Sequence, residues 1–387
     1  MPEAVIVAVG RSPIGRAGKG SLVDMRPDEL GAYVVSKVLD QVPQLPRNEI
    51  QDLMCGCGEP AGEAGFNLAR AISILTRLNV PGTTVNRYCS SSVQTTRMAF
   101  HAIKAGEGDA FVSVGVECIS RYGNGMADMG PARNPRLLPG NAEGLPDLYI
   151  SMGLTAENVA RKLGITRLEM DQFATKSQNA AVESQNNGYF EREIIPIPLP
   201  TGQTVTKDDG PRPGTTVEVL AGLKPAFRED GQVTAGNSCP LNDGAAAVVV
   251  MSDTRARELG LEPLARILAS GVSAVEPELM GLGPIESSMQ ALKRAGMTID
   301  DVDIVEINEA FAAQVIPSAR GIGVDPFSDK LNPHGGAIAL GHPYGMSGAR
   351  ITTTLINGLR TADKTIGLQT MCVGGGQGMA MIIERLH

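Results

Sequence analysis

The chain has 387 residues, 42% of them hydrophobic, with 46 glycines and no tryptophan. Such a length allows two or three domains or one large layered body, and the small, aliphatic composition favours tightly packed α/β layers. The formal net charge of −8 argues against nucleic acid or an anionic membrane as the main partner, although it is compatible with a local basic patch.

No apolar run approaches the ~18 to 20 residues that span a bilayer, and the first residues lack the basic and apolar regions of a secretory signal. The sequence therefore predicts a soluble, cytoplasmic protein. Six cysteines are scattered along the chain: Cys55, Cys57, Cys89, Cys118, Cys239 and Cys372. They are too sparse for a disulfide scaffold, and the Cys-x-Cys spacing is not that of a zinc site, so we expect reduced thiols and no metal.

Strand and helix patterns alternate through the first part of the chain. Strand-like segments occupy residues 3–15, 49–58, 82–86 and 110–117. Helical periodicity occupies residues 28–42, 67–78 and 92–106, the last ending at a glycine. This alternation predicts parallel strands covered by helices on both faces of a sheet.

The rhythm breaks between residues 120 and 240, where Gly, Pro and Asn are frequent and helical patches occur at 154–163 and 168–187. The segment is too long for a connecting loop and predicts a small subdomain laid over the main body.

A strand at 244–252 follows, and the alternation restarts after residue 262. Strands are expected at 264–274, 303–310, 365–372 and 378–386, and helices at 287–296, after 310, and at 348–359.

The element order is alike in the two parts of the chain, each with a cysteine after a strand, namely Cys89 and Cys372. We therefore hypothesise an internal duplication. Three regions are expected: an N-terminal half (residues 1–119 plus 241–264), an inserted loop domain (120–240) and a C-terminal half (265–387).

Four residues at predicted strand ends or loops can carry chemistry: Cys89, Asn308, His342 and Cys372. Cys89 precedes a helix, whose free amides and dipole would lower the pKa of its thiol. The alternative for a free cysteine is a small buried apolar residue.

His342 lies in the glycine-rich segment GGAIALGHPYGMSG, and an imidazole can take a thiol proton near neutral pH. Cys372 precedes GGGQG, whose amides can form an oxyanion pocket or allow a tight chain reversal. Asn308 can orient a water or an oxyanion, or cap a helix. His101 lies on a predicted helix and is interpreted as structural.

Two cysteines and one histidine suit one kind of chemistry in particular. Moving an acyl group to and from a thiol while a carbon–carbon bond breaks or forms requires a thiolate to hold the acyl group and a separate acid/base for the carbanion. A hydrolase would need only one cysteine.

Motifs along the whole chain carry a family resemblance: VAVGRSPIG, NRYCSSS, MGLTAENVA, TAGNSCPLNDGAAA, MGLGP, DIVEINEAFA, NPHGGAIALGHP and CVGGGQG. The chain resembles the thiolases, which cleave 3-ketoacyl-CoA with free CoA or run the reverse condensation. The resemblance implies the thiolase fold, in which two similar halves form a layered αβαβα body with an inserted loop domain that holds CoA.

The resemblance also implies roles for residues at matching positions. Cys89 would carry the acyl group, and His342 would activate it and help to form one oxyanion hole with a water held by Asn308. Cys372 would be the acid/base for the α-carbon of acetyl-CoA. The amides of Cys89 and Gly374 would line the second oxyanion hole.

The substrate itself is CoA-linked, and the resemblance implies no metal and no further cofactor. Residues expected near the pantetheine and acyl group are Met152, Cys239, Met280 and Phe311. Basic residues of the loop domain that can meet the CoA phosphates are Lys207, Arg212, Lys224 and Arg228, although acidic residues interleave them and a plain solvated face is the alternative.

Several positions depart from family patterns. Biosynthetic acetoacetyl-CoA thiolases have a His-Met pair where this chain has Ser151 and Met152, and usually a Lys in the segment that reads Asn-Arg87-Tyr-Cys here. Both differences favour the degradative, 3-ketoacyl type. Cys239 stands where a CoA-contacting serine is common, and His334, where Asn is more usual, is interpreted as structural.

The implied activity is thiolytic cleavage of 3-ketoacyl-CoA to acetyl-CoA and a shortened acyl-CoA through acyl-Cys89, in β-oxidation. The alternatives are an acetoacetyl-CoA thiolase working in the condensation direction, a ketoacyl synthase, and a non-catalytic acyl-CoA or lipid-binding protein of thiolase fold. Family analogy implies a homodimer or homotetramer and allows a hydratase/dehydrogenase subunit as a partner.

Overall fold

The computed structural model describes residues 2–124 and 133–387, so part of the expected loop domain, residues 125–132, lies outside the described residues. The first half of the body contains five main strands and three helices. The strands are β1 (Ala4–Arg11), β3 (Asp52–Gly56), β4 (Gly82–Val85), β5 (Ala110–Cys118) and β8 (Asn242–Ser252). The helices are α1 (Pro27–Leu39), α2 (Leu68–Leu75) and α3 (Ser91–Ala105).

The second half repeats this plan. Its strands are β9 (Ala265–Ala274), β10 (Ile304–Ile307), β11 (Ile366–Val373) and β12 (Gln377–Arg385). Its helices are α8 (Gly283–Ala295), α9 (Ala312–Ile322), the single turn α10 (Ala337–Leu340) and α11 (Ser347–Thr361). The short helix α7 (Asp253–Glu258) joins the halves.

The local sequence explains these elements. β8 is a continuous run of small and β-branched residues, and all eleven of its residues are buried, as expected of a central strand. α3 ends where Gly106 adopts φ +78°, a conformation that favours glycine. The predicted elements therefore occur close to their expected positions.

The strand order is alike in the two halves, as the hypothesis of an internal duplication requires. The order in the first half is β1-β8-β5-β3-β4 and in the second it is β9-β12-β11-β10, where a bridge from Val305 to Leu331 stands in for a fifth strand. If the strands of each half are counted outward from the neighbouring strands β1 and β9, α3 and α11 are equivalent helices. Cys89 thus precedes α3 as His342 precedes α11, whereas Cys372 lies within β11, the counterpart of β5. The two cysteines therefore do not occupy equivalent positions in the two halves, and Cys372 lies inside its strand rather than after it.

The prediction of parallel strands holds only for the outer part of each half. β3 runs parallel to β4 and β5, and β10 runs parallel to β11, but all pairs among β5, β8, β1, β9, β12 and β11 are antiparallel. The cause lies in the connections: β12 follows β11 after a three-residue turn, which only antiparallel strands allow. β8 likewise returns after the insertion rather than after a crossover helix.

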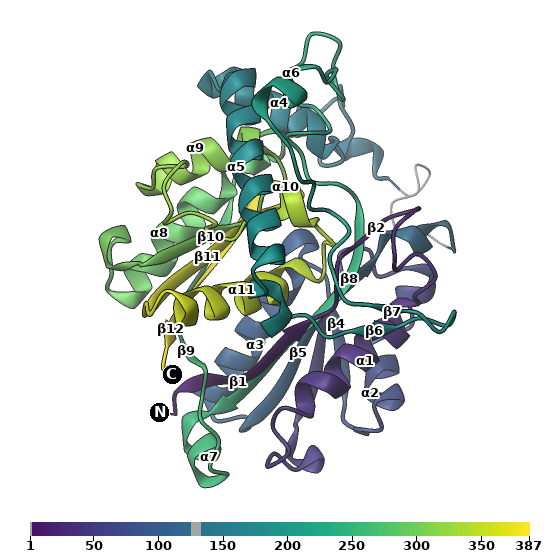
Figure 1. The fold of residues 1–387 in the computed structure, drawn as a ribbon, viewed down its shortest axis with the longest axis vertical. Helices are drawn as coiled ribbons and strands as arrows, with labels where there is room; N and C mark the ends of the chain where they lie inside the picture. The colour runs from purple at the N-terminus through teal and green to yellow at the C-terminus, as the bar shows by residue number, and fades with distance from the viewer. Residues whose placement is uncertain (1, 125–132) are drawn as a thin grey trace.

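Three layers of helices enclose the sheet (Figure 1). α1 and α2 cover the first half, and α8 covers the second, with α9 packed beside it. α3 and α11 contact each other and strands of both halves, so they form the central layer. β1 and β9 pair over only two residues of each strand, and the sheet turns around the central helices at this point. The layered αβαβα arrangement that the sequence predicts is confirmed.

The inserted segment adds α4 (Met152–Leu163), α5 (Arg167–Asn186), α6 (Val217–Ala221) and the small hairpin β6 (Ile197–Pro198) and β7 (Thr204–Val205). α4 and α5 pack on α9, and α5 also contacts α10, at the end of the molecule away from the chain termini (Figure 1). We propose the predicted domain limits, 1–119 plus 241–264, 120–240 and 265–387, because β8 completes the first half after the insertion. Within the described residues, none of the helices has the length and apolar character of a bilayer span.

Candidate active site

Cys89 lies in a tight turn, η3 (Tyr88–Ser90), between β4 and α3, as the sequence predicts. Tyr88 adopts φ +43°, a left-handed conformation that is strained for a residue with a side chain. The turn is held by hydrogen bonds: the Tyr88 amide donates to Asn86 Oδ1 at 2.7 Å, and Ser91 Oγ donates to the Tyr88 carbonyl at 2.7 Å. Strain of this kind is common where a reacting group is presented.

Burial, rather than the helix terminus, dominates the ionisation of Cys89. Burial raises its thiol pKa to about 12, while hydrogen bonds from the amides of Gly374 and of Cys89 itself act in the opposite direction. The expectation of a lowered pKa was therefore wrong for the free protein. The same contacts show that both of these amides lie beside the sulfur atom. A thiol of this kind needs a base before it can attack.

His342 is a buried, neutral base. Its Nδ1 lies 2.5 Å from the Ser347 hydroxyl, which also donates to the Pro343 carbonyl at 2.9 Å. Because a hydroxyl has a single proton, its oxygen accepts from Nδ1–H, and Nε2 is left as the unprotonated nitrogen. Asn308 Nδ2 lies 3.3 Å from Nε2. Burial and the charge of Arg350 lower the pKa of His342 to about 3, so the ring is neutral near pH 7.

The backbone around His342 requires glycine. Gly341 has φ +114°, and a Cβ there would lie 2.5 Å from the side chain of Asn242 on β8. That side chain accepts a hydrogen bond from the His342 amide at 3.0 Å and donates to the Gly15 carbonyl at 2.9 Å. The loop that carries His342, in the second half, is thereby attached to β8 in the first half.

Glu117, at the end of β5, connects the loop that carries His342 to other loops through hydrogen bonds. Its buried carboxylate accepts hydrogen bonds from the amides of Gly58 and Gly345, both at 2.7 Å, and from the Tyr122 hydroxyl at 2.8 Å. Burial raises its pKa, and these bonds partly oppose that rise. Glu117, Asn242 and Ser347 could not be singled out from the sequence, because single polar residues in strand or helix patterns carry no spacing signal.

Cys372 is fully buried in β11 and belongs to the same site. Burial raises its thiol pKa well above the ordinary value, and the neighbouring Cys89 and Cys239 thiols raise it further. The ring of Tyr344 lies edge-on to that of His342 at 5.2 Å, and its pKa is raised by burial and then by Cys239 and Cys89. Three thiols from distant parts of the chain thus lie together, and Tyr344 is a neighbour both of this group and of the His342 ring.

Gly374 begins the turn between β11 and β12. A Cβ at Gly374 would approach the Tyr88 ring to 3.4 Å, and Gly375 and Gly376 have φ of +76° and +79°. A Cβ at Gly376 would lie 2.2 Å from the Val275 carbonyl oxygen. The glycine run therefore makes the tight reversal and also brings an amide to Cys89. The tight reversal that the sequence allowed is observed, and the oxyanion pocket stays a prediction.

The expected acyl and pantetheine residues meet in one cluster. Met280 and Phe311 are buried in it, and Met152 and Cys239 pack against it with partial exposure. Phe227, which the sequence analysis missed, places its ring edge-on to Phe311 at 5.9 Å.

A cleft of about 320 Å³ opens beside this cluster, and Cys239, Phe227, Arg16 and Arg212 are among the residues that line it. Burial and the charge of Arg16 lower the pKa of Arg212. Neither guanidinium is paired with a carboxylate in the described parts of the chain.

The other basic candidates lie elsewhere. Lys207 lines a separate pocket beside Phe190, Arg228 donates to Asn158 Oδ1 at 2.8 Å, and Lys224 is exposed outside the cleft lining. His334 stacks on the ring of Tyr189 at 3.6 Å, which fits the structural interpretation.

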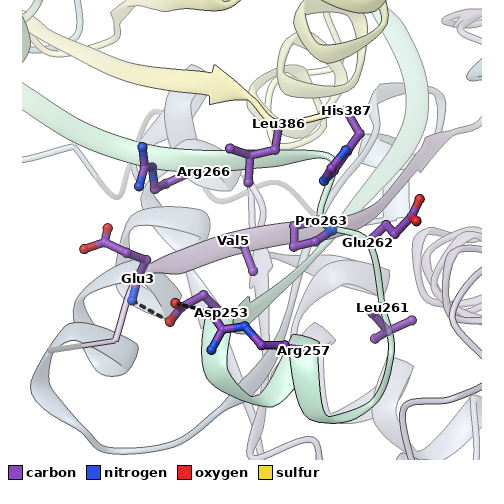
Figure 2. A pocket seen from close by; sticks show the side chains of 10 residues that line it. All are labelled: Glu3, Val5, Asp253, Arg257, Leu261, Glu262, Pro263, Arg266, Leu386 and His387. Atoms are coloured by element: carbon purple, nitrogen blue, oxygen red, sulfur yellow. Dashed lines mark hydrogen bonds and ion pairs between the residues drawn. The ribbon is translucent and has the colours of Figure 1, made fainter.

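A second hollow, of about 330 Å³, lies at the chain ends and contains none of the candidate residues (Figure 2). The charged side chains of Glu3, Asp253, Arg257, Glu262 and Arg266 line it together with the C-terminal Leu386 and His387, and the Glu3 amide donates to Asp253 across its edge. Among residues 2–124 and 133–387, no group of three or more His, Cys, Asp or Glu side chains could hold a metal ion.

Two family models together match almost the whole chain. The family model of the thiolase N-terminal domain matches residues 4–254, and that of the thiolase C-terminal domain matches residues 261–385. The chain belongs to the thiolase family. The resemblance seen in the sequence is confirmed, and the ketoacyl-synthase alternative is not supported.

Thiolase relatives match over their full length. The chain is 42% identical to the 3-ketoacyl-CoA thiolase of Bacillus subtilis (strain 168), covering 99% of this chain and 100% of that one. It is 43% identical to the 3-ketoacyl-CoA thiolase of Cronobacter sakazakii, with both chains covered completely.

Solved thiolase structures match the fold. The acetyl-CoA acetyltransferase of Bacillus anthracis superposes with a TM-score of 0.90 at 38% identity, covering 100% of this chain and 99% of that one. The dimeric peroxisomal thiolase of Saccharomyces cerevisiae gives a TM-score of 0.91 at 35% identity, covering 100% and 98%.

Proposed function

We propose that this thiolase is a 3-ketoacyl-CoA thiolase of the β-oxidation type, which cleaves 3-ketoacyl-CoA with CoA to acetyl-CoA and a shortened acyl-CoA. The observation that carries the proposal is a buried pair of thiols, in which Cys89 raises the pKa of Cys372, with the amides of Cys89 and Gly374 at the Cys89 sulfur. His342 lies against the ring of Tyr344, whose pKa is raised in turn by Cys89. Two thiols and a neutral imidazole are the groups that this reaction needs.

In the first half-reaction, Cys89 gives its proton to His342 and its sulfur attacks the 3-keto carbon. The negative charge on the carbonyl oxygen is stabilised by the amides of Cys89 and Gly374. The bond between the α-carbon and the keto carbon then breaks, and Cys372 gives its proton to the α-carbon of the departing acetyl-CoA. The raised pKa of Cys372 keeps that proton available near neutral pH.

The developing enolate oxygen of acetyl-CoA would be held by His342 and by a water bound to Asn308. Asn308 Oδ1 supports this role, because it is buried without a hydrogen-bond partner among the described residues. In the second half-reaction, CoA gives its thiol proton to Cys372 and attacks the acyl carbon. The bond to Cys89 breaks, and its sulfur recovers the proton from His342.

We further propose that the cleft beside Cys239 receives CoA. Phe227, with Phe311 packed against it, offers apolar surface to the pantetheine. Arg16 and Arg212 offer unpaired positive charge to the phosphates of a substrate that a chain of net charge −8 otherwise repels.

A homodimer is proposed as the working form. β4 is the edge strand of the sheet, and beside it Phe66, Ile74 and Leu75 are exposed apolar residues. The similar yeast thiolase is described as dimeric. Light scattering on the purified protein tests this, because a monomer would contradict it.

Mass spectrometry after incubation with acetyl-CoA tests the site. We expect an acetyl increment on the peptide that contains Cys89, no turnover in Cys89→Ala, and full turnover in Cys118→Ala, a buried cysteine outside the site. Cys372→Ala should still be acylated but should not cleave the carbon–carbon bond. An unlabelled Cys89 in an enzyme that turns over would refute the assignment, as would equal loss of both steps in Cys372→Ala.

The condensation of two acetyl-CoA molecules is a second candidate, because the similar Bacillus anthracis structure is named an acetyl-CoA acetyltransferase and the same groups serve both directions. Steady-state kinetics on 3-ketoacyl-CoA substrates of increasing length separate the two. A preference for longer chains supports the degradative assignment, and activity confined to acetoacetyl-CoA contradicts it. A non-catalytic binding protein would need none of the three reacting groups that are assembled here.

A further inference from the structure

The two amides at the Cys89 sulfur come from different halves of the molecule. The Cys89 amide belongs to the turn before α3, and the Gly374 amide belongs to the turn after β11. Gly374 is followed by two further glycines with positive φ, so this turn has little intrinsic stiffness. Alignment of the pair therefore depends on contacts that join the two turns.

A chain of hydrogen bonds makes this connection. Arg87, two residues before Cys89, donates from Nη1 to Gln377 Oε1 at 2.9 Å. Gln377 in turn donates from Nε2 to the carbonyl oxygen of Gly374 at 3.2 Å. Arg87 is itself held by its Nε, which donates to Gln94 Oε1 on α3 at 3.1 Å, and by its amide, which donates to Ser91 Oγ at 2.9 Å.

Within the described residues, no carboxylate balances the positive charge of Arg87. Its guanidinium is half-buried, and burial lowers its pKa. In the described parts of the chain it pairs with no carboxylate, and its side-chain acceptors are the neutral amide oxygens of Gln94 and Gln377. An arginine can donate in two fixed directions at once, as this bridge between the helix and the turn requires.

We propose that Arg87 and Gln377 form a positioning clamp that holds the Gly374 amide against the Cys89 sulfur and so sets the geometry of the oxyanion hole across the two halves. The inference rests on the proposed function, in which Cys89 is the nucleophile. Arg87 and Gln377 are positioning residues and act through Gly374. The hydrogen bond from Gln377 to the Gly374 carbonyl oxygen restricts the backbone dihedral angles of Gly374. These angles influence the direction in which the N–H group of Gly374 points.

Gln377→Glu is the decisive variant. Glutamate keeps an acceptor for Arg87, and even gains an ion pair, but it cannot donate to the Gly374 carbonyl. We expect kcat to fall about 10- to 100-fold with KM within about twofold, because a misaligned oxyanion donor weakens transition-state binding more than substrate binding. Arg87→Met should give a loss of similar size, and the double variant should be no worse than either single one.

The pH dependence of Cys89 alkylation by iodoacetamide provides a readout without substrate. Because the Gly374 amide lowers the pKa of Cys89, its displacement should shift the alkylation profile of Gln377→Glu upward by on the order of one pH unit. Arg97→Met is the matched control, since Arg97 is a half-buried arginine of α3 that donates to Ser270 Oγ at 3.1 Å and should leave profile and kcat unchanged.

A wild-type alkylation profile and kcat in Gln377→Glu would overturn the clamp, and so would fully additive losses in the double variant. These failures differ from a failure of the proposed function. If the wild-type enzyme did not cleave 3-ketoacyl-CoA, the alkylation shift would still occur. If the clamp were wrong, wild-type thiolysis would remain and the shift would be absent.

Discussion

Ser347 offers a direct test of how the imidazole is held. Ser347→Ala removes the acceptor of the His342 Nδ1 proton from a buried site while leaving the catalytic groups in place. A buried N–H without a partner costs about 1 to 3 kcal/mol. If this cost falls on the transition state, kcat/KM should drop roughly 5- to 150-fold, since about 1.4 kcal/mol corresponds to a factor of ten. KM should change little, because Ser347 contacts Nδ1 and not the reacting nitrogen Nε2.

The assay is the loss of the 3-ketoacyl-CoA enolate absorbance at saturating CoA, together with thermal unfolding of each variant. Ser347→Thr keeps a hydroxyl and should restore most of the activity. Ser288→Ala is the matched control, because Ser288 is a buried serine of α8 whose hydroxyl has no partner among the described residues. Full kcat/KM in Ser347→Ala would refute the reasoning, as would a threonine variant as defective as the alanine one.

Burial raises the pKa of Glu306 from the ordinary 4.5 to about 8, so the folded chain keeps a proton that the unfolded chain releases. The free energy of unfolding should therefore fall as the pH rises through this range, by up to about 1.4 kcal/mol per pH unit, and Glu306→Gln should remove that slope in urea titrations. An unchanged slope would contradict the assignment. Burial lowers the pKa of His334 from 6.5 to about 4, which has the opposite sign. Unfolding should become easier as the pH falls through that window, and His334→Gln should reduce this effect with thiolysis unchanged; a loss of thiolysis would place the imidazole in the site. Arg212→Ala should raise KM for CoA about tenfold with little change in kcat. Arg192→Ala should leave KM unchanged, and equal KM values in the two variants would exclude Arg212 from CoA binding.

The groups proposed to react stand out in the sequence, because each is a chemically distinctive residue close to glycines or serines. Cys89, His342 and Cys372 could be singled out in this way, and their meeting in one site followed from the family pattern. The ionisation of Cys89 could not be predicted. A helix terminus is visible in a sequence, but the burial that outweighs it depends on Tyr344, Cys239 and the glycine turn, which come from other parts of the chain.

The fold was predictable element by element and less so in its connections. The segment lengths gave the strands and helices, but β8 and β12 run antiparallel to their neighbours because of where an insertion and a short turn lie. Supporting residues such as Glu117 and Gln377 resemble ordinary polar positions of strands. Their contacts extend between halves, over 228 residues from Glu117 to Gly345, and no local pattern reports such a pair.

The central position of α3 and α11 has an evolutionary consequence. Each helix packs on strands of the opposite half as well as its own, so neither half can shield its own central helix from water. A single ancestral half would have needed a second copy of itself to fold, and the two helix starts would have carried the same residues. Joining the copies in one chain would remove that equality, and it would allow one helix start to keep a thiol and the other an imidazole.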